Sequence, residues 1–158
     1  LAGFTLPPDK KFIIVKEERI GKEHPFSSEK LCPVLSIFKY GGFDDALEMV
    51  GRIYEVGGKG HSCGIYSFDD EHIHRLALTA PVSRIMVRQP QSKANAGSFT
   101  NGMPMTSSLG CGTWGGNITC ENIHLKHYMN VTWVSRPIPE DRPSEEDLFG
   151  EFYNTETF

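Results

Sequence analysis

The chain has 158 residues, the size of about one domain. Hydrophobic residues make up 39% and charged residues 23%, as in ordinary globular proteins, which excludes a disordered chain. The net charge of −4 argues against a nucleic-acid surface. No apolar run approaches the ~20 residues of a membrane helix. Residues 1–8 lack the features of a secretory signal and the four cysteines are irregularly spaced, so we expect a cytoplasmic protein with reduced thiols.

Two strands and a helix are expected in the first part of the chain. Lys11–Val15 and Leu35–Tyr40 are short apolar runs bounded by turn-forming residues, and the first of them is typical of a buried strand. A helix is expected from about Asp44 to Val56, because apolar residues recur there at steps of three and four. Gly57-Gly58 ends this helix.

The next segment continues the alternation of strands and helices. Ser62–Tyr66 and Ser83–Val87 predict strands, and Asp70–Leu78 between them predicts a helix, with acidic residues early and Pro81 just past its end. Such alternation is typical of parallel strands with helices packed on them. The sequence therefore predicts an α/β fold with a mostly parallel sheet and flanking helices.

The remainder of the chain has a different pattern. Gln89–Asn117 is rich in Gly, Ser, Pro, Thr and Asn and is too long for a simple connector, so it is expected to be a functional loop. Tyr128–Ser135 predicts a strand with no partner nearby, which would pair with another subunit. The acidic, proline-containing tail ends in a short helix that Ser144–Asp147 would cap.

Gly110–Gly116 (GCGTWGG) matches the GxGxxG pattern of dinucleotide-binding proteins. The context does not fit that function, because no strand leads directly into the match and no acidic residue follows at the required distance. We therefore interpret it as a loop whose backbone approaches another group closely, which glycine permits.

A zinc site is the other chemistry that residue types alone bring to mind. Cys111, Cys120, His124 and His127 are suitable ligand types. However, eight residues separate the two cysteines, unlike the short spacing of a zinc knuckle. We expect packed thiols, surface histidines and no metal.

Two single residues also qualify as site candidates. His61 follows a glycine-rich turn at the start of a predicted strand, where an imidazole can act as a general acid or base. Glu29 precedes another predicted strand. By themselves, both residues are more simply explained as solvated surface side chains.

Three ordered motifs resemble one enzyme family. His24–Leu35 (HPFSSEKLCPVL) resembles a motif of the aldehyde dehydrogenase superfamily, which implies that Glu29 binds the nicotinamide ribose. Gly57–Tyr66 and Ser108–Asn117 are similar to the CoA-acylating branch of that superfamily. The resemblance implies that His61 is catalytic and that a glycine-rich loop lines the pocket for substrate and nicotinamide. In that loop the pocket residues would be Gly110, Cys111, Gly112 and Thr113.

Within this branch, Arg88–Ser92 and Asn95–Gly102 look most similar to acylating sulfoacetaldehyde dehydrogenases. If the aldehyde carries a sulfonate, a guanidinium is a suitable partner for it, and Arg88 is the nearest candidate. This assignment depends only on the place of Arg88 at the start of the loop.

The resemblance implies a reaction of an aldehyde with NAD or NADP and CoA that yields an acyl-CoA. The family's nucleophilic cysteine lies upstream of the segment that resembles this chain, and none of the four cysteines here has its context. We therefore expect part of a homo-oligomeric enzyme: a partial catalytic domain at 1–127, an oligomerisation strand at 128–136 and an acidic tail at 137–158. The alternative is a catalytically inactive module that acts only in assembly.

Overall fold

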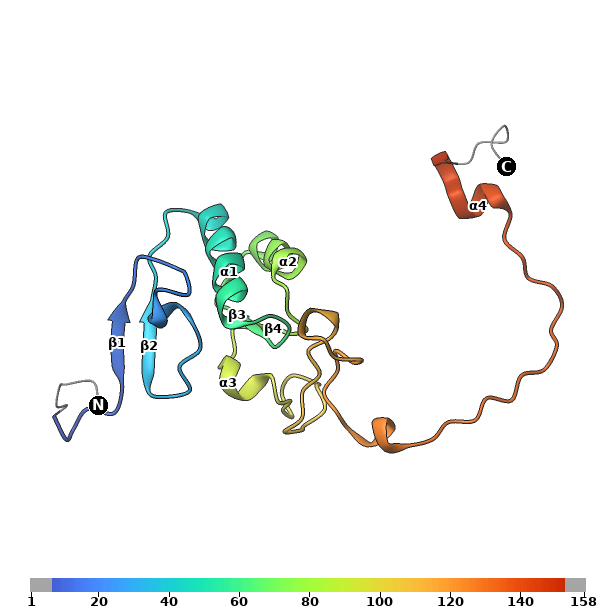
Figure 1. Ribbon diagram of the computed structural model, residues 1–158. Coiled ribbons are helices and arrows are strands. Elements are labelled where there is room, and N and C mark those ends of the chain that lie inside the picture. The colour runs from blue at the N-terminus through green and yellow to red at the C-terminus, as the bar shows by residue number, and fades with distance from the viewer. Residues whose placement is uncertain (1–6, 153–158) are drawn as a thin grey trace. The chain divides into compact units, whose positions relative to one another are not determined.

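Two pairs of parallel strands organise the chain. The computed structural model describes residues 7–152. Strand β1 (Ile13–Lys16) pairs with β2 (Val34–Ile37), and β3 (Cys63–Ile65) pairs with β4 (Ile85–Val87) (Figure 1). All four strands overlap the segments expected from the sequence, which confirms the α/β class. Within the described residues the strands form two separate two-stranded sheets.

Two helices pack against the β3–β4 pair. Helix α1 (Phe43–Gly57) ends where Gly58 takes a φ of 98° and donates its N–H to the carbonyl of Tyr54, as the glycine pair predicts. Helix α2 (Asp70–Thr79) connects β3 to β4, and the Asp69 side chain caps it by accepting two backbone N–H groups. A crossover helix of this kind is what a parallel strand pair requires.

The core is small and lies between β3, β4 and the two helices. Cys63, Leu76, Ala80 and Val82 are buried there, and the apolar stripe of α1 packs against them. The expected burial of the first strand is not found, because β1 and β2 have only each other as partners. Ile14 in β1, for example, remains 54% exposed.

Short helical turns interrupt the loops. The 3₁₀ turn η1 (Pro25–Ser27) precedes β2, and α3 (Gln91–Ala94) follows β4. Two more 3₁₀ turns, η2 (Thr113–Gly115) and η3 (Leu125–Tyr128), lie in and after the glycine-rich loop. None of the four was expected, since each is too short for a hydrophobic period to show.

The chain divides into two compact units, Leu1–Tyr128 and Met129–Phe158. In the second unit, Ser144 is the N-cap of α4 (Glu145–Phe149) and forms the expected capping box. The turn η4 (Gly150–Phe152) follows the helix. The strand expected at 128–135 does not form in the single chain, because a strand needs hydrogen-bonding partners and no other segment of residues 7–152 pairs with it. Pairing of this segment with another copy stays a prediction.

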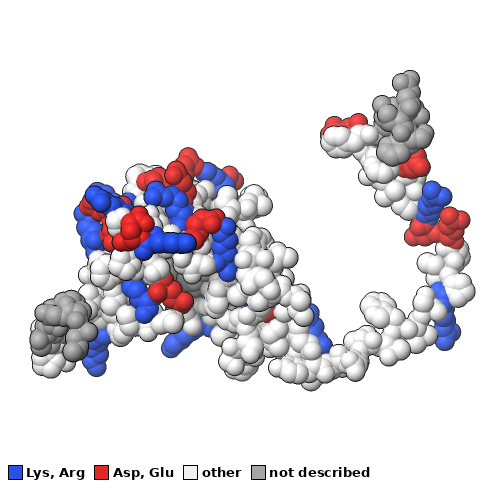
Figure 2. Space-filling view, viewed as in Figure 1, with Lys and Arg blue, Asp and Glu red and all other residues white. Residues whose placement is uncertain are grey.

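Charge is mixed on the surface of the first unit. Figure 2 shows acidic and basic side chains interspersed over the helical part of the face in view, with no region of a single sign. Among residues 7–152, no helix has both the length and the apolar character to cross a membrane.

Candidate functional site

A turn that only glycine can form presents His61. Gly60 has a φ of 104°, and a Cβ on it would lie 2.5 Å from the carbonyl oxygen of Cys111 and 2.9 Å from the backbone nitrogen of Gly115. Such approaches exclude any larger residue. The turn before His61 therefore packs directly on the glycine-rich loop, so the fold brings these two sequence motifs together.

The His61 ring is held by a chain of polar groups, of which Ser62 and Asn95 are buried. Its Nδ1 lies 2.8 Å from Oγ of Ser62, and that oxygen also accepts hydrogen bonds from Nε2 of Gln91 at 3.0 Å and Nδ2 of Asn95 at 3.2 Å. Ser62 and Asn95 are 4% and 8% exposed.

These contacts determine the tautomer of the imidazole. A hydroxyl has one proton to donate and two lone pairs to accept with. Because Gln91 and Asn95 occupy both acceptor positions of Ser62, the Ser62 proton is donated to His61 Nδ1. The neutral ring of His61 therefore carries its own proton on Nε2, on the side away from buried Ser62.

Glu29 and His61 line one groove. The groove has a volume of about 470 Å³ and lies between the segment from η1 to β2 and the C-terminal end of α1. Ser62 and Gln91 line it as well, so the polar chain behind His61 forms part of its wall. Within the described residues, the exposed Glu29 carboxylate has no hydrogen-bonding or ion-pair partner.

A single buried arginine joins the turn to the glycine-rich loop. The Arg84 side chain, 4% exposed, donates to the carbonyl oxygens of His61 at 3.1 Å, Gly110 at 2.8 Å and Cys120 at 3.3 Å. Its Nε donates to Oδ1 of Asn122 at 2.7 Å. Burial lowers the pKa of Arg84, but a guanidinium still remains charged at neutral pH.

Asn122 extends this arrangement to the preceding loop. Its Nδ2 donates to the carbonyl oxygens of Asn95 at 3.0 Å and Pro104 at 2.9 Å. Sequence reasoning missed Arg84 and Asn122, as it missed Ser62, Gln91 and Asn95. The sequence signal that could have found this arrangement was Arg84, a single charged residue directly before the apolar strand β4.

The glycine-rich loop is tightly packed. A Cβ on Gly110 would collide with the carbonyl of Thr119, and Gly112 has a φ of 60°. Cys111 is half-buried and Thr113 begins η2. The four expected pocket residues do not line the groove of Glu29 and His61. They connect to it through Arg84 and through the contact of Gly60 with Cys111.

Arg88 lies apart from the groove. It follows β4 with a φ of 53°, and its Nη1 donates to the carbonyl oxygen of Ser67 at 2.7 Å. Its guanidinium lies 4.9 Å from the centre of the Phe68 ring. The side chain is exposed and does not line the groove with Glu29 and His61.

Cys63 is the one buried cysteine among the described residues, and it lies beside Tyr54. Burial raises the pKa of both groups, and their proximity adds to the increase for Tyr54. A thiol in this state is a poor nucleophile. The Tyr54 hydroxyl donates to the carbonyl oxygen of Ser62 at 2.6 Å, which ties α1 to the residue that holds His61.

Comparisons with known proteins confirm the resemblance drawn from the three motifs. No protein-family model matches the chain. Sulfoacetaldehyde dehydrogenase from an Acholeplasma species is 45% identical over 151 residues, which are 96% of this chain and 31% of that protein. The acylating sulfoacetaldehyde dehydrogenase of Bilophila wadsworthia is 41% identical over 154 residues, 96% of this chain and 33% of that protein.

The fold agrees with the sequence match. The crystal structure of an acetylating aldehyde dehydrogenase from Geobacillus thermoglucosidasius superimposes with a TM-score of 0.76 at 34% identity, over 88% of this chain and 31% of that one. The chain spans about a third of the length of the curated relatives it matches. It is similar in sequence and in fold to a segment of these acylating and acetylating aldehyde dehydrogenases.

Proposed function

We propose that this chain supplies part of the active site of a CoA-acylating aldehyde dehydrogenase, which converts an aldehyde, NAD(P)+ and CoA to an acyl-CoA and NAD(P)H. The observation that carries the proposal is the shared groove of Glu29 and His61, which come from two different motifs of that family. The names of the two curated relatives support sulfoacetaldehyde as the aldehyde.

The residues present fit a nicotinamide cofactor. The Glu29 carboxylate is exposed in the groove and has no partner among residues 7–152, so its oxygens are available to accept hydrogen bonds from a ribose diol. When bound, the cofactor supplies hydride acceptance. Glu29 would orient the ribose, and with it the nicotinamide ring, relative to His61.

The role of His61 follows from its tautomer. With Nδ1 occupied by the Ser62 proton, the neutral ring carries its N–H on Nε2, and His61 lines the groove. This supports His61 as a hydrogen-bond donor to the aldehyde or acyl oxygen rather than as the base for the CoA thiol. The polar groups behind Ser62 fix the ring before substrate arrives, which reduces the cost of reorganisation in the transition state.

The glycine-rich loop would form the adjoining wall of the pocket. Arg84 holds the Gly110 carbonyl and the His61 carbonyl with one guanidinium, so the two walls are fixed relative to each other. Arg88 stays the candidate for the sulfonate, although it does not line the groove with His61. It is exposed and uses one Nη1 bond to Ser67, which leaves other N–H groups for an oxyanion.

The test is a segment exchange. This chain would replace the matching segment of the Bilophila wadsworthia relative, and NAD(P)H formation from sulfoacetaldehyde and CoA would be measured. We expect an active chimera in which His61→Ala lowers kcat and Glu29→Gln raises KM for the nicotinamide cofactor. His74→Ala, at an exposed histidine of α2, is the matched control and should change neither.

Two outcomes would contradict the proposal. A chimera that has the Tm of the unaltered Bilophila wadsworthia relative but makes no NAD(P)H would show that this chain cannot replace the matching segment in catalysis. If instead the chain alone turned over, the nucleophile would be one of its own cysteines, and the assignment of the nucleophile to another segment would be wrong.

A role in assembly alone is the second candidate. The observation in its favour is a set of exposed apolar residues near the start of the second unit. Val131, Trp133 and Val134 are 71%, 91% and 81% exposed. Light scattering of the purified chain would test it, because an assembly segment predicts a stable oligomer that Trp133→Ser converts to monomer. A wild-type chain that is monomeric at all concentrations would exclude self-association.

A further inference from the structure

Two histidines and a glutamate gather on the surface beyond the glycine-rich loop. Glu121 is held in place because its carbonyl oxygen accepts the N–H of Gly110 at 2.9 Å. His124 and His127 follow, and the N–H of His127 donates to the His124 carbonyl oxygen at 2.9 Å in the turn η3. One nitrogen or oxygen of each side chain lies within 4.8 Å of the others. We refer to these three residues as the Glu121 cluster.

Glu121 and His127 have nearly the spacing of two metal ligands. Nε2 of His127 lies 3.2 Å from Oε2 of Glu121. Two ligand atoms bound tetrahedrally to zinc at ~2.0–2.2 Å are separated by about 3.3–3.6 Å. The pair would therefore need to open by only a few tenths of an ångström to admit an ion.

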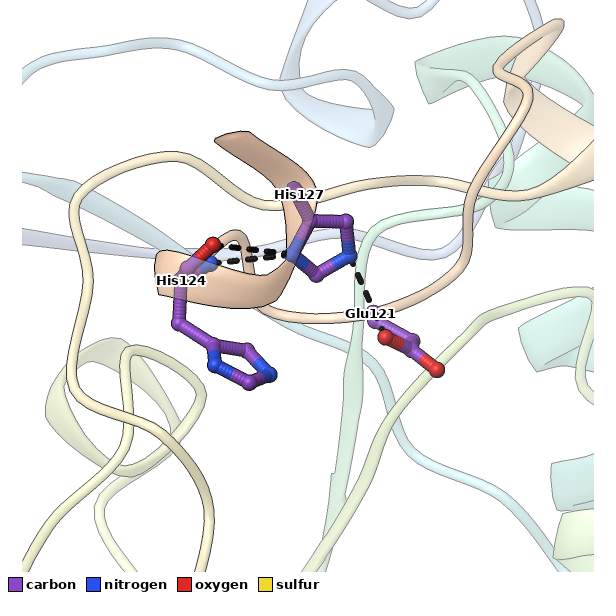
Figure 3. A group of neighbouring side chains, drawn as sticks. All are labelled: Glu121, His124 and His127. Atoms are coloured by element: carbon purple, nitrogen blue, oxygen red, sulfur yellow. Dashed lines mark hydrogen bonds and ion pairs between the residues drawn. The ribbon is translucent and has the colours of Figure 1, made fainter. Parts of the chain in front are cut away.

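The second nitrogen of His127 has the partner that a metal-bound imidazole usually has. Its Nδ1 lies 3.2 Å from the carbonyl oxygen of His124, and Figure 3 shows the ring between that backbone and the Glu121 carboxylate. In the tautomer with the proton on Nδ1, this nitrogen donates to the carbonyl and leaves the Nε2 lone pair for a metal. The same Nδ1 also lies 3.1 Å from the His124 backbone nitrogen. In the tautomer without a proton on Nδ1, this nitrogen accepts the His124 N–H when no metal is bound.

Space for an ion and its remaining ligands is present. Glu121 and His124, but not His127, line an open hollow of about 300 Å³, together with the exposed Cys120 and with Lys126. The Lys126 ammonium forms an ion pair with Oε2 of Glu121. A bound metal must displace this ammonium, so Lys126 competes with the metal for the carboxylate.

We propose that Glu121, His124 and His127 form a binding site for a zinc-like divalent cation, with water in the fourth position. Two imidazoles and one carboxylate are ligands that zinc accepts in proteins. The site differs from the one weighed in the sequence, because Glu121 replaces the two cysteines. Its function would be structural, since it would fasten η3 to the strand-like segment that holds Asn122 against Arg84. The inference is independent of the proposed reaction.

The test is Co²⁺ and Zn²⁺ binding to the reduced, untagged chain. We expect one equivalent of Co²⁺ to give a visible d–d spectrum without a thiolate charge-transfer band, and one equivalent of Zn²⁺ to compete with it. In calorimetry, Glu121→Gln and His127→Ala should each weaken Zn²⁺ binding by more than the ~10–100-fold loss that follows removal of an outer-shell partner. Glu121→Gln is nearly isosteric, so it reports on ligation even if His127→Ala disturbs the turn.

Three further variants separate this site from others. Lys126→Met removes the competing ammonium and should tighten Zn²⁺ binding about two- to fivefold, the amount expected for a surface ion pair. Cys120→Ser and His74→Ala should leave the affinity unchanged. Absence of binding, equal affinity in Glu121→Gln, or loss of binding in Cys120→Ser would each overturn the proposal. The last result would point to a cysteine-containing site instead.

Discussion

Replacing Arg84 with methionine keeps an unbranched side chain but removes the four hydrogen bonds that the guanidinium donates within the candidate site. The bonds to Asn122 Oδ1 and the Gly110 carbonyl are buried, and each buried acceptor left without a donor costs ~1–3 kcal/mol. Those to the His61 and Cys120 carbonyls are only partly buried, so water can replace them. The guanidinium also no longer has to be desolvated, which offsets part of the loss. We expect the free energy of unfolding to fall by ~2–4 kcal/mol.

Urea unfolding followed by tryptophan fluorescence measures this loss, and Arg88→Met is the matched control. Arg88 makes the same kinds of contact on the surface, with one hydrogen bond to Ser67 and a stack on Phe68. Its loss should cost less than ~1 kcal/mol. If the free energies of unfolding of Arg84→Met and Arg88→Met differed by less than ~0.5 kcal/mol, the reasoning about the buried carbonyls would be refuted.

Three other predictions follow from the same contacts. Ser62→Ala removes the proton donated to His61 Nδ1, so the preference for the Nε2–H tautomer should fall by ~1 kcal/mol, about fivefold. Nitrogen NMR spectra of the ring measure the ratio of the two tautomers, and an unchanged ratio would contradict the proton assignment. Because burial raises the pKa of Cys63 and Tyr54, the folded chain keeps both protons to higher pH than the unfolded chain. Its Tm should therefore fall as pH rises past the ordinary thiol pKa of ~8.5 and fall further past the ordinary tyrosine pKa of ~10, and Tyr54→Phe should remove only the second part; a Tm independent of alkaline pH would be evidence against this linkage. In the chimera, Arg88→Gln should weaken kcat/KM for sulfoacetaldehyde much more than for acetaldehyde, and equal losses would remove Arg88 from the substrate site.

The elements that the sequence predicted are those whose signal is local. Helix α1 has an apolar stripe and a terminal glycine pair, and α2 has early acids and a following proline, so both were placed within a residue or two. The strands of the two parallel pairs were found for the same reason. The segment at 128–135 forms no strand within residues 7–152, because alternation makes a segment able to pair but does not supply a pairing strand, and its pairing with another copy stays a prediction.

The site was harder to foresee, because its geometry depends on contacts between distant residues. The motifs named Glu29 and His61, and the fold brings both to one groove. Nothing in either motif indicates that Ser62 is bonded by Gln91 and Asn95, since these amides come from a one-turn helix and the loop after it. A glutamine or asparagine in a polar loop is usually solvated, and only tertiary packing distinguishes these two.

Arg84 explains why such an irregular site can still be rigid. His61 and Gly110 each follow an isolated bridge rather than lie within a strand ladder, and no backbone N–H of residues 7–152 bonds their carbonyl oxygens. Buried carbonyls need a donor, and a guanidinium offers five N–H groups in one plane. Within residues 7–152 Arg84 has no carboxylate partner, so its donors go to backbone oxygens and to Asn122. One side chain thus replaces a missing set of ladder bonds. A lysine, which concentrates its donors at a single point, could not bridge the same carbonyls.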